Sequence, residues 1–490
     1  MLTTVRHTDF FIMNETYDLI VIGGGSAGLV AAGGAGILGA KVALIEKAKL
    51  GGDCLWTGCV PSKAFIRSAR YASSMQRAEK YGYETVLPKF KNNDFASITK
   101  RVQNVVDIIK EHDSPEVFEE MGAEIVFGTP KFISKNEVEV VLKETGKKRI
   151  MKAKRFCIST GSSPFIPPIE GIEEMGYLTN EDVFHIKQLP ECIVIIGGGA
   201  IGLELGQSFA RFGSRVTLME MLDRILVQED EEVSALLQET LEKEGARVLT
   251  KTKAVKFHRE PGGKRIVTVE KDGKTSTFSC DQILVAAGRK PNIEGLNLEK
   301  AGVEIERGKI KVDEYLRTTN KNIYAAGDVN GKFQFTHMAD YEAQIVLKNC
   351  FLFYPLMTKA DYRVVPWTTF SEPEVGRVGM LEREARAKFG DSVKVYKVPF
   401  SHNDRALAEG EPFGFAKLVT KGKKILGVTI VGLHAGELLS EFTVAMKHGL
   451  SIAQLNEAIH VYPTLSKITQ ALGTEGTIEE LKKPWVQKWF

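Results

Sequence analysis

The chain has 490 residues, 43% of them hydrophobic, which predicts two to four globular domains with substantial cores. Lys and Arg total 65 against 62 Asp and Glu, so the net charge of +3 argues against nucleic-acid binding and gives no bulk attraction to an anionic membrane. Six cysteines in so long a chain do not indicate a secreted disulfide framework, and no signal-peptide pattern opens it, so we expect a cytoplasmic protein.

The first predicted strand covers residues 17–22 and follows a loose extension over residues 1–15. It runs into a glycine-rich turn, residues 23–28, and then a helix-like stretch. No residue from Leu19 to Ala40 is charged, a length that could cross a bilayer, but eight of these residues are glycine. We therefore interpret this stretch as strand, turn and tightly packed helix, with a membrane span as the rejected alternative.

The same pattern occurs a second time, from residue 192. A strand over residues 192–196 leads into a glycine turn at residues 197–202 and another helix-like stretch. In both copies a second strand then ends in an acid, Glu46 in the first and Glu220 in the second. One glycine fingerprint is weak evidence, but two copies in this context predict two dinucleotide sites.

Each glycine of such a fingerprint has a physical task. The first permits the tight turn, the second lets the backbone approach a pyrophosphate, and the third lets the helix pack on the strand. The acid accepts hydrogen bonds from a ribose. These glycines are Gly23, Gly25 and Gly28 in the first copy and Gly197, Gly199 and Gly202 in the second.

Two cysteines, Cys54 and Cys59, lie between the two copies and close after the first. Four residues separate them, and Pro61 and Lys63 follow. A close cysteine pair beside a nucleotide site predicts a redox couple that stores two electrons as thiols and releases them as a disulfide. A helix beginning near Pro61 would lower a thiol pKa and favour reactivity.

These motifs resemble the pyridine nucleotide-disulfide oxidoreductases, a family that includes dihydrolipoamide dehydrogenase, glutathione reductase and mercuric reductase. The resemblance covers about residues 17 to 475. It implies an α/β fold with two Rossmann-like dinucleotide-binding domains, for FAD and NAD(P), and a C-terminal α+β dimerisation domain. It also implies bound FAD, a nicotinamide cofactor and a homodimer.

Turn-rich breaks at residues 160–164 and 286–292 give the expected domain boundaries. The FAD domain would comprise residues 1–160 and, as its second, central part, residues 286–360. The NAD(P) domain would comprise residues 161–285, and the dimerisation domain with its tail residues 361–490.

The resemblance also implies roles for individual residues. Cys54 would attack the acceptor, and Cys59 would exchange electrons with the flavin. Lys63 would lie near the flavin and pair with Glu204, an arrangement in which the carboxylate offsets the cost of burying the ammonium. The remaining expected FAD contacts are Gly23, Gly25, Gly28, Glu46, Gly52, Thr160, Gly161 and Asp328. The expected NAD contacts are Gly197, Gly199, Gly202, Glu220 and Gly288.

The nicotinamide cofactor can be argued from the end of the second strand. A free ribose hydroxyl needs an acid, whereas the 2′-phosphate of NADPH needs a cation. Glu220 therefore favours NADH. Arg224 is close enough in sequence to leave NADP(H) open, although its alternative role is that of a surface or capping arginine.

The chain departs from its relatives at residues 460–467. In dihydrolipoamide dehydrogenases a histidine acid-base stands where this chain has Tyr462, and its carboxylate partner stands where it has Lys467. A phenol titrates near pH 10, so we expect weak activity on lipoamide or glutathione, with Lys467 only partly favouring a tyrosinate. Mercuric reductases share the tyrosine, but their C-terminal cysteine pair is missing here because no cysteine follows Cys350. We expect no bound metal.

Several alternatives stay open. The acceptor could be a disulfide, metal ion, quinone or dioxygen, and the runner-up functions are mercuric ion reductase, dihydrolipoamide dehydrogenase and a non-enzymatic FAD-loaded partner protein.

Next to the dithiol, Asp53 should raise the pKa of Cys54. Trp56 could form a wall of the cleft or pack between subunits. The aromatic and basic tail, residues 477–490, packs on its own dimer or contacts a membrane or another protein.

Overall fold

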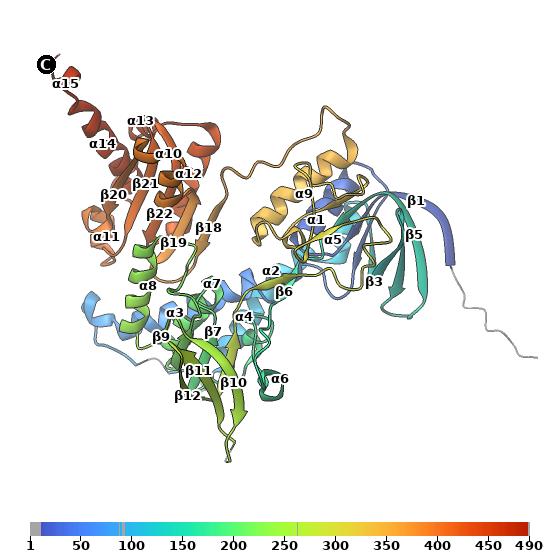
Figure 1. Ribbon diagram of the computed structural model, residues 1–490, viewed down its shortest axis with the longest axis horizontal. Coiled ribbons are helices and arrows are strands. Elements are labelled where there is room, and N and C mark those ends of the chain that lie inside the picture. Colours follow the sequence, from blue (N-terminus) through green and yellow to red (C-terminus); the bar gives the residue numbers. More distant parts are fainter. Residues whose placement is uncertain (1–10, 88, 91–93, 262, 489–490) are drawn as a thin grey trace, which may run out of the picture.

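The computed structural model describes residues 11–87, 89–90, 94–261 and 263–488. They form three folded regions, two α/β regions and a C-terminal α+β region, arranged around a central opening in the ribbon (Figure 1). No helix among these residues is long and apolar enough to cross a membrane. The expected fold class is confirmed.

The first α/β region is built on a six-stranded sheet. β3, β2, β1, β5 and β17 run parallel, while β4 pairs antiparallel with the far halves of β3 and β5. Apolar residues fill both faces of this sheet. Its strands are β1 (Phe11–Ile22), β2 (Val42–Glu46), β3 (Ala123–Ser134), β4 (Glu137–Leu142), β5 (Lys148–Ile158) and β17 (Ile323–Ala325).

The second α/β region holds a four-stranded parallel sheet in the order β13-β7-β8-β9, with a three-stranded antiparallel sheet, β10-β11-β12, beside it. Short strands β6 (Ser162–Pro164) and β14 (Arg289–Pro291) pair where the chain enters and leaves this region. The other strands are β7 (Cys192–Ile196), β8 (Arg215–Met219), β9 (Arg247–Leu249), β10 (Lys253–Arg259), β11 (Arg265–Lys271), β12 (Lys274–Cys280) and β13 (Gln282–Val285).

The C-terminal region is a five-stranded antiparallel sheet in the order β18-β19-β22-β21-β20, with helices packed on it. Its strands are β18 (Pro366–Thr369), β19 (Glu374–Gly379), β20 (Val393–Pro399), β21 (Phe415–Lys421) and β22 (Lys424–Gly432). A two-stranded ribbon, β15 (Ile305–Glu306) and β16 (Lys309–Ile310), lies in the connection that precedes β17.

The helices alternate with the strands as the two predicted nucleotide folds require. The α-helices of the two α/β regions are α1 (Ser26–Ile37), α2 (Gly52–Trp56), α3 (Cys59–Gln76), α4 (Ala96–Ile109), α5 (Pro115–Glu120), α6 (Ile172–Met175), α7 (Ala200–Phe212), α8 (Glu231–Lys243) and α9 (Thr336–Phe351). Those of the C-terminal region are α10 (Glu382–Phe389), α11 (Asp404–Ala408), α12 (Ala435–His448), α13 (Ile452–Glu457), α14 (Lys467–Leu481) and α15 (Pro484–Gln487).

Helix α3 leaves the first region and packs along α7 of the second (Figure 1). Phe65 on α3 is fully buried and meets Phe209 and Phe212 of α7 edge to face, with ring centroids 5.5 and 5.1 Å apart. Such aromatic contacts contribute about 1 kcal/mol each beyond their buried area. The helix that begins at the second cysteine is therefore fixed to the second nucleotide fold.

The structure corrects the expectation for the N-terminal end of the chain and shows helices near the C-terminal end. Residues 11–15, expected in a loose extension, belong to β1, which pairs with β5 from Phe11 onward; residues 1–10 lie outside the described residues. At the other end, α14 continues to Leu481, and Pro484 begins a short helix, α15, as proline at a first helical position can. Residues 489–490 also lie outside the described residues.

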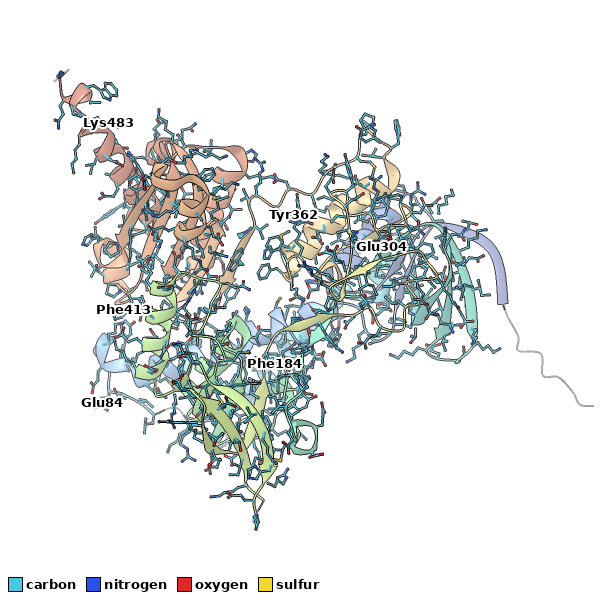
Figure 2. The ribbon with its side chains drawn as sticks, viewed as in Figure 1. Glu84, Phe184, Glu304, Tyr362, Phe413 and Lys483 are labelled. Carbon is cyan, nitrogen blue, oxygen red and sulfur yellow. The ribbon has the colours of Figure 1, made fainter. Side chains whose placement is uncertain are left out.

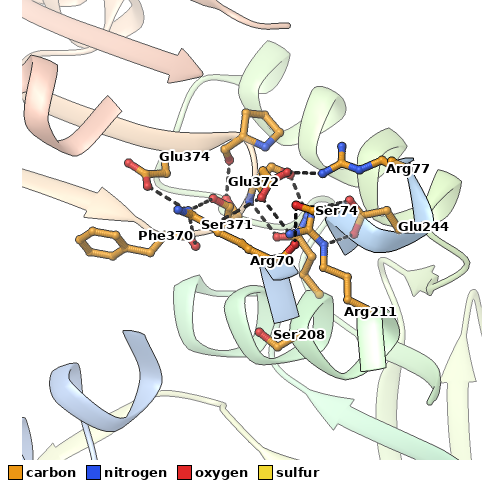
Figure 3. A network of polar contacts seen from close by, with 12 residues as sticks. Arg70, Ser74, Arg77, Ser208, Arg211, Glu244, Phe370, Ser371, Glu372 and Glu374 are labelled. Carbon is orange, nitrogen blue, oxygen red and sulfur yellow. Dashed lines mark hydrogen bonds and ion pairs between the residues drawn. The ribbon is translucent and has the colours of Figure 1, made fainter. Parts of the chain in front are cut away.

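A buried ionic network joins α3, α7 and the C-terminal region (Figure 3). Arg211 on α7 binds Glu244 at 2.6 Å and Glu372 at 3.0 Å, and its own side chain is 4% exposed. Arg70 on α3 binds Glu374 at 2.9 Å, and Arg77, directly after α3, binds Glu372 at 2.6 Å. Arg77 and Arg211 hold the pKa of Glu372 below its ordinary value despite its burial.

We expect Arg211→Ala to lower the free energy of unfolding by about 3 kcal/mol, because it leaves Glu244 and Glu372 without their shared cation. Lys243→Ala, which removes an exposed pair with Glu239, is the matched control and should change it by about 0.5 kcal/mol or less. Guanidinium unfolding curves measure both. Equal effects of the two variants would show that the network does not stabilise the junction.

Candidate active site

The two glycine turns make matching backbone hydrogen bonds. Gly23 N–H donates to Ile45 O and Gly197 N–H to Met219 O, each at 2.8 Å. Both residues have positive φ, +105° and +110°, and an added Cβ would lie 2.5 Å from Ser159 O in one turn and 2.3 Å from Ala286 O in the other. Only glycine fits these positions.

The third glycine of each turn is required by close packing of the helix on the turn. A Cβ at Gly28 would lie 1.8 Å from Gly23 O, and one at Gly202 would lie 2.0 Å from Gly197 O. The second glycines are different. A Cβ added at Gly25 would be at ordinary contact distance from Gly52 only. A Cβ added at Gly199 would meet no described atom within 4 Å. Both line open space, as a close pyrophosphate requires.

The two acids close the turns in the same way. Glu46 accepts hydrogen bonds from Gly24 N–H at 2.7 Å and Ala48 N–H at 2.7 Å. Glu220 accepts from Gly198 N–H and Leu222 N–H, both at 2.8 Å. Each carboxylate oxygen keeps a further lone pair, and both residues line the cleft, so each can also accept from a ribose hydroxyl.

A single cleft of about 2170 Å³ connects both turns with the cysteine pair. Its volume exceeds the range of about 300–1,000 Å³ that is usual for one small-molecule site. The cleft can hold two dinucleotides. There is open space at Gly25 and Gly199 for their pyrophosphates, and Glu46 and Glu220 have lone pairs left for their riboses. FAD in the first turn and a nicotinamide dinucleotide in the second are therefore compatible with the residues present.

The cysteine pair lies in this cleft, between the turns. Cys54 is in the short helix α2, Cys59 is the first residue of α3, and Cys59 is the more exposed. Sγ of Cys59 is 3.2 Å from the hydroxyl of Thr336, which begins α9. Both are free thiols in this structure.

The two thiols have opposite ionisation tendencies. A hydrogen bond from Cys54 lowers the pKa of Cys59 to about 6, and Thr336 and Lys63 act in the same direction against the effect of burial. The pKa of Cys54 is raised, chiefly because its thiol donates to Cys59 and because it is buried; Asp53 adds to this, as expected, but is a minor cause. These opposite shifts favour Cys59 as the member of the pair that ionises.

Lys63 is one helical turn after Cys59 and lies between two partners. Its ammonium is 3.1 Å from Oε2 of Glu204, a carboxylate whose side chain is 7% exposed. It also lies 4.3 Å from the ring centroid of Phe370, whose backbone N–H donates to Glu204 at 2.8 Å. Phe370 therefore holds both members of the pair, the cation by its ring and the anion by its backbone.

Asp328 lies in a second cluster of polar and charged side chains. Ser162 donates to Asp328 at 2.5 Å, and Arg289 lies 3.8 Å from it and 3.2 Å from Asp53. Burial raises the pKa of Asp328, while Ser162 and Arg289 oppose that shift. Because Asp53 lies in α2, Arg289 connects the cysteine loop to Asp328, one of the expected FAD contacts.

The two turn-rich breaks lie side by side. Thr160 donates to Asn292 O at 2.6 Å, and Asn292 N–H donates to Gly161 O at 2.9 Å. Gly288, with φ of +117°, accepts from Phe165 N–H and lines the cleft. The chain thus leaves and re-enters the first region at one place, beside the expected cofactor contacts.

Trp56 lines the cleft and donates to Leu50 O at 2.6 Å. Lys49 lies 4.3 Å above its ring. Trp56 therefore forms part of a wall of the cleft, which is one of the two alternatives that the sequence offered. Its contribution to a subunit contact stays a prediction.

The expectation that Lys467 would favour a tyrosinate at Tyr462 is wrong. The hydroxyl of Tyr462 donates to Asp404 at 3.0 Å, while Lys467 begins α14 and binds Gln470. The Asp404 carboxylate raises the pKa of Tyr462. Tyr462 is 66% exposed, and the part of the chain that the structure describes places it outside the cleft.

Sequence reasoning missed four residues at this site: Thr336, Arg289, Phe370 and Asp404. Arg289 lies within the turn-rich break at residues 286–292, so it was adjacent to a sequence signal. Thr336 and Phe370 have no local pattern, because their partners are more than 160 residues away. Among the described residues, no group of three or more His, Cys, Asp and Glu is placed to hold a metal ion.

Comparison with known protein families identifies two matches. Residues 17–343 match the pyridine nucleotide-disulphide oxidoreductase model, and residues 365–472 match the dimerisation domain of the same family. Together these matches include both turns, the cysteine pair and Tyr462.

Curated relatives and solved structures agree with these matches. The chain is 36% identical to a mercuric reductase of Bacillus cereus, with 93% of this chain and 70% of that one covered. It is 35% identical to a dihydrolipoyl dehydrogenase of Bacillus subtilis (strain 168), with 93% and 97% covered. A Cu(II) complex of RclA, an HOCl-induced flavoprotein disulfide reductase from Escherichia coli, is 26% identical with a TM-score of 0.82, covering 94% and 99%.

We expect alkylation of Cys59 in a reduced Cys54→Ser variant to follow a pH midpoint near 6, because the serine hydroxyl replaces the thiol as donor. In Cys54→Ala the donor is lost, and the midpoint should rise by about one pH unit or more. Iodoacetamide labelling followed by peptide mass spectrometry measures both. A midpoint near ~8.5 in both variants would contradict the assignment of Cys59 as the thiolate.

Proposed function

Because this chain belongs to the pyridine nucleotide-disulphide oxidoreductase family, we propose that it oxidises NADH and passes two electrons through FAD and the Cys54–Cys59 couple to an acceptor. Family membership supports a flavoprotein that uses a pyridine nucleotide. The observation that carries the rest is the single cleft lined by both glycine turns and by both cysteines.

When bound, FAD supplies the chemistry that takes a hydride from the nicotinamide and returns an electron pair to sulfur. In balance, NADH, a proton and the Cys54–Cys59 disulfide give NAD⁺ and two thiols, one of which ionises. We assign Gly23, Gly25, Gly28 and Glu46 to the FAD pyrophosphate and ribose, with Gly52, Thr160, Gly161 and Asp328 beside the remaining parts. Gly197, Gly199, Gly202, Glu220 and Gly288 are assigned to the nicotinamide dinucleotide.

The chain's own residues explain why the couple is directional. Cys59, with its thiolate near Lys63 and Thr336, is suited to exchange electrons inside the cleft. Cys54 remains a thiol when Cys59 is ionised. It becomes the attacking thiolate once its proton has moved to Cys59. The ammonium of Lys63, fixed by Glu204 and Phe370, stabilises negative charge that develops in the cleft.

We propose NADH rather than NADPH. Glu220 lines the cleft at the end of β8, where it would meet the 2′-phosphate of NADPH with like charge. The Arg224 guanidinium is 3.3 Å from Asp223 and donates to Val227 O at 3.3 Å. These local contacts support the alternative in which Arg224 does not serve the cofactor.

We propose a homodimer joined through the C-terminal region. This region matches a dimerisation domain, and its segment 459–462 presents Ile459, Val461 and Tyr462 at 99%, 73% and 66% exposure. Such contiguous exposed apolar surface is typical of an interface. Tyr462 would then reach the cleft of the partner subunit.

The acceptor is constrained by Tyr462. A phenol that donates to Asp404, with its pKa raised, is a poor proton shuttle at neutral pH, so lipoamide and glutathione should be weak acceptors. A metal ion is the second candidate acceptor, because reducing it requires no proton relay to a leaving thiol, and mercuric reductases are among the relatives. The missing C-terminal cysteine pair leaves such an ion without its usual delivery ligands.

Cys54→Ser tests the relay. Turnover of NADH with a small disulfide should fall by about a thousandfold or more, because the attacking thiol is lost. Reduction of bound FAD by NADH in a single turnover should remain, and Ser74→Ala on α3 is the control for an unrelated hydroxyl. Retention of full disulfide turnover would contradict the relay.

Steady-state kcat/KM values for NADH and NADPH in the same assay test the choice of cofactor. A preference for NADPH would contradict the proposal that NADH is the electron donor.

Tyr462→His should raise turnover on lipoamide by about a hundredfold, because an imidazole held by the Asp404 carboxylate titrates near neutrality. The gain should follow a bell-shaped pH profile that the parent protein lacks. Tyr462→Phe is the matched control and should show no gain. An unchanged rate in Tyr462→His would mean that this position does not limit proton transfer.

A further inference from the structure

An exposed apolar surface lies at the corner where α1 and α9 end, away from the site described above. We call it the apolar corner. It consists of Ile37, Leu38, Phe351, Leu352, Phe353, Tyr354 and Leu356. Phe353 and Tyr354 are 71% and 74% exposed, and Ile37 and Leu38 are 70% and 64% exposed. This degree of exposure is unusual for so many neighbouring large apolar side chains.

Helix packing makes these residues one surface. A Cβ added to Gly34 on α1 would lie 2.4 Å from Leu347 on α9, so the helices touch there. Leu38 follows Gly34 by four residues, and Phe351 follows Leu347 by four. Residues four apart share a helix face, so both lie one turn beyond the contact, and residues 352–356 continue from Phe351.

The apolar corner points away from the cleft. Both α1 and α9 begin at the cleft, at Ser26 and Thr336, and their 12 and 16 residues give lengths of about 18 and 24 Å. The segment after α9 rises above that helix at the outer edge of the first region (Figure 1), and Figure 2 shows side chains projecting from this edge. The cleft stays open when this corner is covered.

The charged residues in the two segments that form the apolar corner are all lysines. From residue 343 to residue 360 the charged residues are Lys348 and Lys359, and from residue 19 to residue 45 the sole charged residue is Lys41. Lys348 is exposed and one turn before Phe351 on α9. Lys359 pairs with Glu314 at 3.2 Å, and Lys41 lies over the ring of Tyr17. Lys348 therefore provides an exposed cation beside the apolar side chains, whereas Glu314 offsets the charge of Lys359.

From this composition we propose that the apolar corner docks shallowly on the surface of an anionic lipid bilayer. Phenylalanine, tyrosine and leucine beside lysine are the residue types that favour a membrane interface, and lysine is attracted to anionic headgroups. The segment after α9 protrudes at the outer edge of the first region (Figure 1), as insertion between headgroups requires. Docking would place the flavoprotein at a bilayer while both nucleotide turns remain accessible.

Vesicle sedimentation tests this with the full-length, FAD-loaded protein. It should cosediment with vesicles of phosphatidylcholine containing about a third phosphatidylglycerol and much less with phosphatidylcholine alone. Phe353→Ser with Tyr354→Ser should lower the bound fraction about tenfold, and Lys348→Glu should lower it about threefold. The flavin spectrum and thermal midpoint of each variant report that it is folded.

Phe413→Ser with Tyr83→Ser is the matched control, since these residues are 60% and 74% exposed elsewhere, and it should bind vesicles like the parent protein. Failure of the parent protein to bind anionic vesicles, or equal binding by the Phe353 and Tyr354 double variant, would overturn the proposal. Loss of binding on truncation after Leu481 alone would assign it to the C-terminal tail instead. A larger mass in light scattering that Phe353→Ser with Tyr354→Ser abolishes would identify a second copy as the occupant.

Discussion

The ion pair between Lys63 on α3 and Glu204 on α7 is the interaction on which the arrangement of this site depends. It joins the helix that carries Cys59 to the helix that follows the second glycine turn. Glu204 is buried, so its charge requires a close partner. Phe370 N–H supplies a second hydrogen bond from the C-terminal region, and the pair therefore connects all three regions at the cleft.

Helix α3 extends this connection beyond the site. Cys59, Lys63, Arg70 and Arg77 follow one another at intervals of four, seven and seven residues, which places them along one side of the helix. The first two face the cleft, and the arginines bind Glu374 and Glu372 of the C-terminal region. One helix thus positions the reactive sulfur and fixes the region expected to supply the dimer contact.

Much of the fold followed from local pattern. β7 begins and ends where the sequence placed it, β2 ends at the predicted acid, Glu46, and both glycine turns form with matching hydrogen bonds. These features were predictable because turn sterics and strand periodicity act over fewer than ten residues. The two acids, Glu46 and Glu220, are at the glycine turns for the same reason.

The missed features depend on contacts between distant segments. Phe370 and Thr336 reach the site only because the C-terminal region and α9 fold against it, and no periodicity marks them. The assignment of Lys467 to Tyr462 failed because closeness in sequence does not fix direction: α14 begins at Lys467, whereas Asp404 comes from a separate helix, α11. The start of β1 at Phe11 was missed because its partner strand, β5, is over 130 residues away.

The central claim is that electrons leave the flavin through the Cys54–Cys59 couple. Anaerobic titration of the purified protein with dithionite, followed by flavin absorbance and thiol counting, tests it most directly. The account predicts uptake of about four electrons per subunit, two by FAD and two by the disulfide, with two new thiols that map to Cys54 and Cys59. Uptake of about two electrons, with no new thiol, would contradict it.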